Sequence, residues 1–269
     1  MQVACSTICY KNHAWPEVLD AMAADGWRNV ELVAIPGWIH IDVVQTDANT
    51  LVKEMTKRGL VLSAIHAGAL MGTDRLASMC QLSYMRAAID LLEEAGAAQL
   101  VFTGGKRANE NLDDFVSALA QLAEHLDGTS VKIGLENHYN NCIETIDDYD
   151  YIFARIDHPQ IGIAADFGHF NSSKVDAAEL LRKHAHRINH VHVKDHVGTA
   201  SVRLGAGEVD IPALLAILRG IGYQRSLSVE LEVQDEENLR SYAREALEYL
   251  SNVSACVGLG LGSTPQQHT

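Results

Sequence analysis

Four residues that can bind a metal ion recur at intervals of roughly 30 residues in the second half of the chain, about the length of one strand-plus-helix unit. They are Glu136, Asp166, His192 and Glu230, and each stands at the end of a short run of apolar and small residues. Successive side chains of a strand point to opposite faces. The strand phase therefore places all four on the face opposite their apolar neighbours.

Three carboxylates and one imidazole on a shared inward face predict a metal site. Buried charges are costly unless they are paired or bound to a metal, and neighbouring carboxylates raise one another's pKa. A divalent cation removes both problems. The oxygen-rich set suits Mn²⁺, Mg²⁺ or Co²⁺ better than a thiolate-rich zinc site would. We therefore expect one divalent metal ion, with Mn²⁺ favoured.

Eight predicted strands, alternating with eight amphipathic segments, must position these residues. The strands are expected at residues 3–8, 29–33, 60–66, 98–103, 131–136, 161–166, 188–194 and 226–231. The helices are expected near residues 15–25, 46–58, 77–95, 111–127, 145–156, 176–186, 211–221 and 236–251. Strict alternation indicates parallel strands covered by helices. The pattern predicts an α/β protein, a single (β/α)₈ TIM barrel over residues 1–253, with a flexible tail over residues 254–269.

An open, doubly wound sheet is the main alternative fold. That fold usually carries a glycine-rich loop after its first strand. Here the first strand runs into residues 7–11, TICYK, which contain no glycine. The closed barrel is therefore favoured, and its active site is expected at the carboxyl ends of the strands.

Composition narrows the function classes. The formal net charge of the 269 residues is −14, which repels a polyanion such as DNA unless a basic groove exists. No apolar run of about 18 residues predicts a membrane span, and the N-terminus does not resemble a signal peptide. Five cysteines without a C-x-x-C pair favour a cytoplasmic location. We expect a small neutral or cation-assisted substrate and neither a nucleic-acid nor a membrane partner, with homo-oligomerisation left open.

Other polar residues are expected near the strand ends. His190, Lys194 and Glu232 share the inward phase, and we interpret His190 and Glu232 as supporting residues outside the ligand set. His66 is expected in the wall of the site, while Glu31 fits either a structural pair or a substrate contact. The loops after the first four strands carry further candidates for the pocket: Tyr10, Trp38, His66, Met71, Lys106 and Arg107.

Five short motifs resemble, in order, those of the xylose isomerase-like TIM barrel superfamily. They are Leu135-Glu136-Asn137-His138, Asp166-Phe167-Gly168-His169, His190-Val191-His192-Val193-Lys194-Asp195, Gly205-Ala206-Gly207-Glu208-Val209-Asp210 and Val229-Glu230. Within the superfamily, the sugar phosphate isomerase/epimerase group and the ketose 3-epimerases look most similar. The resemblance covers the chain to about residue 252.

This resemblance implies a role for each matching residue. The metal ligands would be Glu136, Asp166, His192 and Glu230. Glu136 and Glu230 would also form the acid/base pair on opposite faces of the substrate. His169 and Arg203 would bind the substrate, and Lys194 and His66 are further substrate-binding candidates.

Together these roles predict a metal-dependent isomerase or epimerase that acts on a ketose or keto-polyol. One glutamate would remove the proton next to the carbonyl, and the other would return a proton to the opposite face or the next carbon. The metal would stabilise the enediolate between these steps. Loss of a β-hydroxyl from the same enediolate would instead make the protein a lyase, such as an inosose-type or dehydroshikimate-type dehydratase or a C-glycoside-cleaving enzyme.

Two further functions are disfavoured by particular residues. An apurinic endonuclease would need a multi-zinc site, but the fourth strand ends in Phe102-Thr103-Gly104-Gly105 and offers no histidine. A barrel that binds a sugar without converting it would be expected to lack Glu136 or Glu230, and both are present.

Overall fold

The computed structural model describes residues 1–35, 37–70, 75–109, 111–258 and 260. Within these residues, parallel strands close into an eight-stranded barrel, in which β10 pairs with both β7 and β1. The barrel strands are β1 (Gln2–Ser6), β2 (Asn29–Val33), β3 (Val61–Leu70), β4 (Gln99–Gly104), β5 (Lys132–Glu136), β6 (Ile161–Asp166), β7 (Ile188–Val193) and β10 (Ser226–Val229). The predicted TIM barrel is confirmed.

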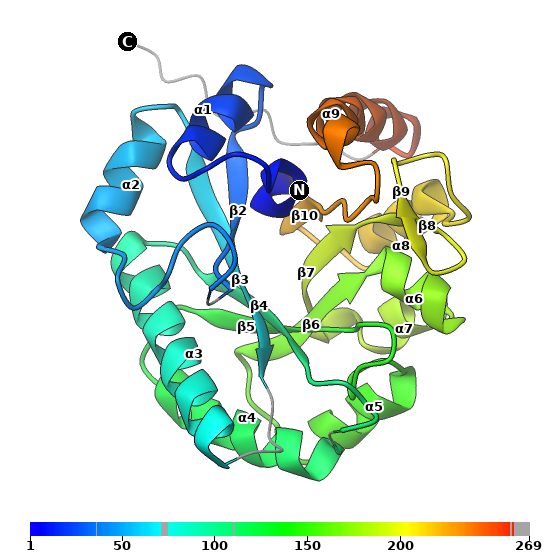
Figure 1. Ribbon diagram of the computed structural model, residues 1–269. Helices are drawn as coiled ribbons and strands as arrows, with labels where there is room; N and C mark the ends of the chain where they lie inside the picture. The colour runs from blue at the N-terminus through cyan, green and yellow to red at the C-terminus, as the bar shows by residue number, and fades with distance from the viewer. Residues whose placement is uncertain (36, 71–74, 110, 259, 261–269) are drawn as a thin grey trace.

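Helices surround the strands, as Figure 1 shows. The helices that match the predicted segments are α1 (Glu17–Ala24), α2 (Ala48–Thr56), α3 (Arg75–Ala95), α4 (Leu112–Leu126), α5 (Ile146–Phe153), α7 (Ala177–Lys183), α8 (Ile211–Gly220) and α9 (Leu239–Cys256). Several begin at side-chain caps, because Asn111, Thr145 and Asp210 each accept a hydrogen bond from a backbone N–H of the first turn.

Additional elements lie in the loops after the strands. A short helix, α6 (Phe167–Ser173), follows β6, and a hairpin of β8 (Asp195–Val197) and β9 (Ala200–Val202) follows β7. Three 3₁₀ turns, η1 (Thr7–Tyr10), η2 (Ala185–Arg187) and η3 (Glu236–Asn238), complete the described elements. The hairpin and α6 place extra structure at the carboxyl ends of β6 and β7, where the predicted site residues stand.

The strand phase separates the core from the barrel interior. Leu135, Val191 and Val229 are fully buried in the hydrophobic layer beneath the helices. Inside the barrel, Gly134 leaves room for Asn189, because a Cβ at residue 134 would lie 2.9 Å from Asn189 Oδ1. Asn189 Nδ2 donates to Ile133 O at 2.8 Å, so polar side chains as well as apolar ones fill the interior.

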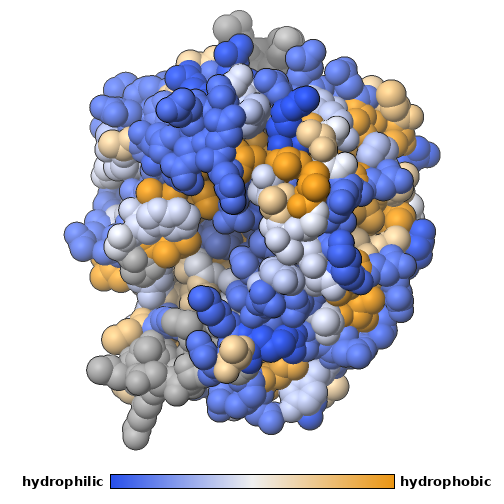
Figure 2. All heavy atoms as spheres, turned by 45° about the vertical axis from the view of Figure 1, so that its right-hand side comes forward, coloured by the Kyte–Doolittle hydropathy of each residue, from blue (hydrophilic) through white to orange (hydrophobic). Residues whose placement is uncertain are grey.

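The ends of several elements differ from the predicted ones. β7 ends at Val193 and β10 at Val229, so Lys194 and Glu230 lie just beyond their strands. Helix α9 runs to Cys256 and buries Ser254, whereas residues 261–269 of the predicted tail and Met71 lie outside the described residues. None of the described helices is long and apolar enough to cross a membrane. The face shown in Figure 2 is mainly hydrophilic, with apolar side chains in scattered patches.

Candidate metal centre

Four side chains from neighbouring strand ends converge inside the barrel mouth. Each of Glu136, Asp166, His192 and Glu230 offers one ligand atom, and these atoms lie within 4.8 Å of one another. All four residues are buried. His192 is central to the group, because its Nδ1 lies 2.6 Å from Glu136 Oε1, 3.4 Å from Glu230 Oε2 and 3.8 Å from Asp166 Oδ2.

Hydrogen bonds from two neighbouring segments hold Asp166 in place. Asp166 is the N-cap of α6, and its Oδ1 accepts a hydrogen bond from the N–H of His169 at 2.7 Å. Asn137 reaches across from the end of β5: its Nδ2 donates to Asp166 O at 3.0 Å, and its Oδ1 accepts from Asp166 N at 2.8 Å. These bonds leave Oδ2 of Asp166 directed at the cluster.

Lys194 brings a buried positive charge to the same carboxylates. Its Nζ lies 2.6 Å from Glu230 Oε2, 2.8 Å from Glu232 Oε2 and 3.2 Å from Asp166 Oδ2. Burial would lower the pKa of Lys194, but the surrounding carboxylates raise it well above its usual value. Lys194 in turn lowers the pKa of Glu232 to about 2, so both groups are charged at neutral pH.

The two glutamates of the cluster have pKa values shifted in opposite directions. Burial raises the pKa of Glu230 despite the nearby His192 and Lys194. Burial would also raise the pKa of Glu136, but His192 and His66 outweigh it and hold this pKa well below the usual range. His66 contributes through its Nε2, which lies 3.1 Å from Glu136 Oε2.

The arrangement fits a divalent cation. Three carboxylates and one imidazole nitrogen form an oxygen-rich donor set of the kind that Mn²⁺ and Mg²⁺ accept. Oδ2 of Asp166 is buried and accepts no hydrogen bond from the described residues, although Lys194 Nζ is near it. A buried carboxylate oxygen without a hydrogen bond is costly, and a cation would satisfy it.

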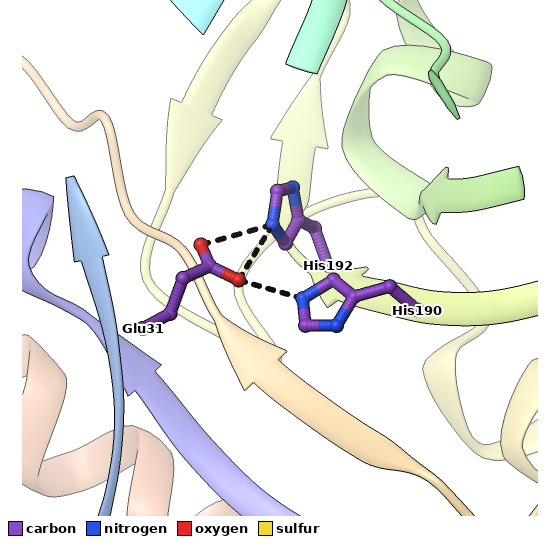
Figure 3. Close-up of side chains that lie close together, drawn as sticks. All are labelled: Glu31, His190 and His192. Carbon is purple, nitrogen blue, oxygen red and sulfur yellow. Dashed lines mark hydrogen bonds and ion pairs between the residues drawn. The ribbon is translucent and has the colours of Figure 1, made fainter. Parts of the chain in front are cut away.

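Glu31 is buried, and its carboxylate pairs with two histidines, His190 and His192. Figure 3 shows its carboxylate between His190 and His192, with Oε2 2.6 Å from His190 Nε2 and Oε1 3.0 Å from His192 Nε2. Glu31 lies on β2, across the barrel interior from β7.

The structure brings His66, His169 and Lys194 to the cluster. The His169 ring packs on His138 with centroids 3.9 Å apart, and its Nε2 lies 3.3 Å from Lys194 Nζ. Arg203 is not brought there, because its side chain is about half exposed and its Nη1 lies 3.8 Å from Glu245 of α9.

The remaining described pocket candidates from the first four loops either pair with residues outside the cluster or are exposed. Tyr10 is buried in the core, where its hydroxyl donates to Asp25 and accepts from Trp27. Arg107 pairs with Glu144 and Asp148, while Trp38 and Lys106 are exposed.

The Gly-x-Gly motif, Gly205-Ala206-Gly207, shapes the loop that follows the β8–β9 hairpin. Oδ2 of Asp195 accepts hydrogen bonds from Gly205 N and Gly207 N, both at 2.9 Å. A Cβ at residue 207 would overlap the Asp195 carboxylate, so this position requires glycine. Sequence reasoning assigned no role to Asp195 or to Asn137, although both stand in motifs that resemble those of the superfamily and Asn137 directly follows a strand-ending glutamate.

Comparison with known proteins places this chain in a family. A profile of the xylose isomerase-like TIM barrel family matches residues 19–253. The rhizopine catabolism protein MocC of Rhizobium meliloti is 28% identical over 62% of this chain and 58% of its own length. An inosose dehydratase of Clostridium tetani is 27% identical over 54% of this chain and 56% of its own length. The chain thus spans little more than half of these relatives.

A solved structure supports the same fold. The crystal structure of a D-tagatose 3-epimerase-like protein superposes with a TM-score of 0.76, at 22% identity, over 94% of this chain and 99% of that one. The likeness at this identity is one of fold. Because the family profile covers most of the chain, the protein belongs to the xylose isomerase-like TIM barrel family.

Proposed function

We propose that this protein is a divalent-metal-dependent isomerase or epimerase of a ketose or keto-polyol. The observation that carries the proposal is the convergence of two carboxylates, Glu136 and Glu230, on His192 Nδ1 at 2.6 and 3.4 Å. Glu136 ends β5 and Glu230 follows β10, so the two flank Asp166 and His192 along the barrel wall. A substrate between them would meet a carboxylate on each side.

Glu136, Asp166, His192 and Glu230 would hold the metal, most favourably Mn²⁺. When bound, the cation would supply positive charge that stabilises the charge developing on the carbonyl oxygen of the substrate. One of the two glutamates accepts the proton from the carbon next to the carbonyl. The other donates a proton to the opposite face of that carbon, or to the neighbouring carbon. The first outcome inverts a stereocentre, and the second moves the carbonyl.

His169 is suited to bind a substrate oxygen. An ammonium group has no lone pair, so Lys194 Nζ can only donate to His169 Nε2, which lies 3.3 Å away. The proton of a neutral imidazole then resides on Nδ1. His169 Nδ1 is buried and has no hydrogen-bond partner among the described residues, so its N–H is available to a ligand.

A lyase is the second candidate, and the position of Lys194 favours it. Lys194 Nζ lies 2.6 Å from Glu230. Glu230, whose pKa is raised by burial, could protonate a hydroxyl group that leaves from the β-carbon, while Lys194 donates a hydrogen bond to the departing oxygen. A glutamate would take the proton next to the carbonyl, the C–O bond would break, a C=C bond would form and water would depart. A related chain from Clostridium tetani bears the name inosose dehydratase, which is a reaction of this type.

The test is conversion of a panel of ketoses and keto-inositols in D₂O with Mn²⁺, followed by mass spectrometry. An epimerase gives a product with the same composition as the substrate except that one carbon-bound hydrogen is replaced by deuterium, whereas a dehydratase gives a product that has lost water. Glu136→Gln and Glu230→Gln should each slow the conversion by about 10²–10⁴-fold. Glu144→Gln is the matched control, because Glu144 is a partly buried glutamate that pairs with Arg107. Full conversion by both cluster variants would overturn the assignment.

A further inference from the structure

The carboxylate of Glu31 is fully buried at the floor of the metal centre. It stands on β2 with no exposed surface, and the residues beside it on β7, His190 and His192, are equally buried. Among the described residues, only these two histidines lie within 4.0 Å of its oxygens as cationic or potentially cationic partners. Burial of a charged carboxylate is costly without such partners. A function for Glu31 at this site would explain its place inside the barrel.

The hydrogen bond from His192 to Glu31 places a proton on Nε2 of the histidine ring. A carboxylate can only accept hydrogen bonds. Glu31 Oε1 lies 3.0 Å from His192 Nε2, so Nε2 must be the protonated nitrogen in this bond. Nδ1 lies 2.6 Å from Glu136 Oε1, a distance at which it also donates a proton to a carboxylate. A cation held by Glu136, Asp166 and Glu230 would take the place of that proton, and the hydrogen bond to Glu31 would keep the remaining proton on Nε2, with the Nδ1 lone pair facing the cation.

His190 in turn restrains Glu31. Its Nε2 lies 2.6 Å from Glu31 Oε2, and its ring stands at 89° to that of His192, with centroids 5.1 Å apart. His192 Nε2 contacts both oxygens of Glu31, at 3.0 and 3.2 Å, and His190 contacts Oε2, as Figure 3 shows. The carboxylate cannot rotate without breaking a contact to one of them.

We infer that Glu31, held by His190, is a positioning residue that fixes the tautomer and ring orientation of His192 so that Nδ1 is presented to the metal. Carboxylates that accept from the second nitrogen of a metal-binding histidine have this effect in other metalloproteins, and their loss weakens metal affinity about 10–100-fold. The inference rests on the proposed function, because it concerns the same metal centre.

The test uses the full chain and Glu31→Gln, which keeps the shape of the side chain and removes the charge. Mn²⁺ affinity is measured by competition with a fluorescent chelator, and we expect it to fall about 10–100-fold. Loss of a nearby negative charge would also weaken cation binding, so a second readout is needed. In protein loaded with diamagnetic Mg²⁺, long-range ¹H–¹⁵N spectra should show His192 protonated at Nε2. In Glu31→Gln that proton should exchange faster with solvent.

Glu232→Gln is the matched control. Glu232 is also an acid beside the centre, but it contacts Lys194 and not His192. We expect this variant to reproduce the purely electrostatic part of the affinity loss and to leave the His192 spectrum unchanged. If Glu31→Gln does not fold, His190→Gln is measured in the same way and should shift both readouts in the same direction by a smaller amount.

Each contrary result has a distinct meaning. If the wild-type chain binds Mn²⁺ and Glu31→Gln binds it equally well with the same His192 spectrum, the inference is wrong and the proposed function stands. Lower stability of Glu31→Gln without a change in either readout would show a merely structural residue. Two metal ions per wild-type chain and one per Glu31→Gln chain would make Glu31 a ligand instead. Absence of metal binding by the wild-type chain would overturn the proposed function itself.

Discussion

The ammonium group of Lys194 lies 2.6 Å from Oε2 of Glu230, with both side chains buried. The same nitrogen lies 3.2 Å from Asp166 Oδ2. Lys194 therefore supplies, from within the chain, a positive partner for two of the three clustered carboxylates. The candidate metal site and this ion pair share the same oxygens, so binding of a cation should weaken the ion pair and the ion pair should lower the affinity for a cation.

Lys194→Met should destabilise the protein in the presence of a chelator. The substitution keeps an unbranched stem but leaves Asp166 and Glu230 without their cation, and loss of one partner of a buried pair costs about 3–5 kcal/mol. Urea unfolding with EDTA measures the effect. Lys183→Met is the control, because Lys183 pairs with Asp150 at the surface, where loss of an exposed ion pair is expected to change the stability far less. Equal losses in the two variants would contradict the prediction.

Glu136→Gln and Glu230→Gln should each reduce kcat by about 10²–10⁴-fold, the range expected for a lost general acid or base. Glutamine keeps the volume of the side chain, so the far-UV circular dichroism should remain that of the wild type. Steady-state kinetics on the substrate found in the panel gives the comparison. Activity within a few-fold of wild type in both variants would show that the proton is carried by other groups.

Asp166→Asn and His192→Ala should lower metal content before they alter the fold. Each removes one of the four converging donors, and Asp166 Oδ2 is the donor without a hydrogen bond. Elemental analysis after dialysis against trace Mn²⁺ should give about one ion per wild-type chain and clearly less in the variants. An unchanged content in both would refute this ligand set.

The stability contributed by Asp25 should depend on pH. Burial would raise the pKa of Asp25, but hydrogen bonds from Arg240 and Tyr10 outweigh it, so the folded-state pKa lies below the usual value. A lowered carboxyl pKa stabilises the folded state above the unfolded-state pKa of about 3.9, and this contribution disappears as the pH falls through the folded-state pKa. Urea unfolding of wild type and Asp25→Asn should differ at pH 7, and the difference should shrink near pH 3. A constant difference would contradict this account.

Gly207→Ala should destabilise the loop after the hairpin. The added Cβ would overlap the carboxylate of Asp195, and forced overlap of this kind costs about 1–3 kcal/mol. Gly220→Ala is the control, since nothing lies within 4 Å of a Cβ there, and a gain of about 0.4–1 kcal/mol is expected. Thermal unfolding of the two variants should therefore shift in opposite directions.

The barrel and the convergence of the cluster could be predicted because both depend on short-range periodicity. The alternation of Val191 and Val193 with His190 and His192 defines the two faces of one strand, and unit spacing brings successive strand ends together. Helix α6 was not predicted, because it is only seven residues long and its N-cap, Asp166, is also the last residue of β6.

Contacts between distant residues could not be predicted in this way. Arg203 stands near the Gly-x-Gly turn in the sequence, but hydrogen bonds from that turn to Asp195 shape the loop, and the arginine lies near Glu245. The pairing of Glu31 with His192 joins residues 161 positions apart. No local pattern indicates such a partner, and the two interpretations of Glu31 remained equal until the fold placed β2 opposite β7.

The paired hydrogen bonds between Asn137 and the main chain of Asp166 have a consequence for protein design. The last paired residues of β5 and β6 are Glu136 and Ala164, so Asn137 connects the two segments just beyond the ladder. Asn137 thereby fixes the positions of Glu136 and Asp166 relative to each other. Glu230 lies one residue beyond β10, and its N–H donates a longer hydrogen bond to Val193 O, at 3.3 Å. A designer who grafts this centre onto another barrel would need to transplant Asn137 with the ligands, and would have to build the support for Glu230 anew.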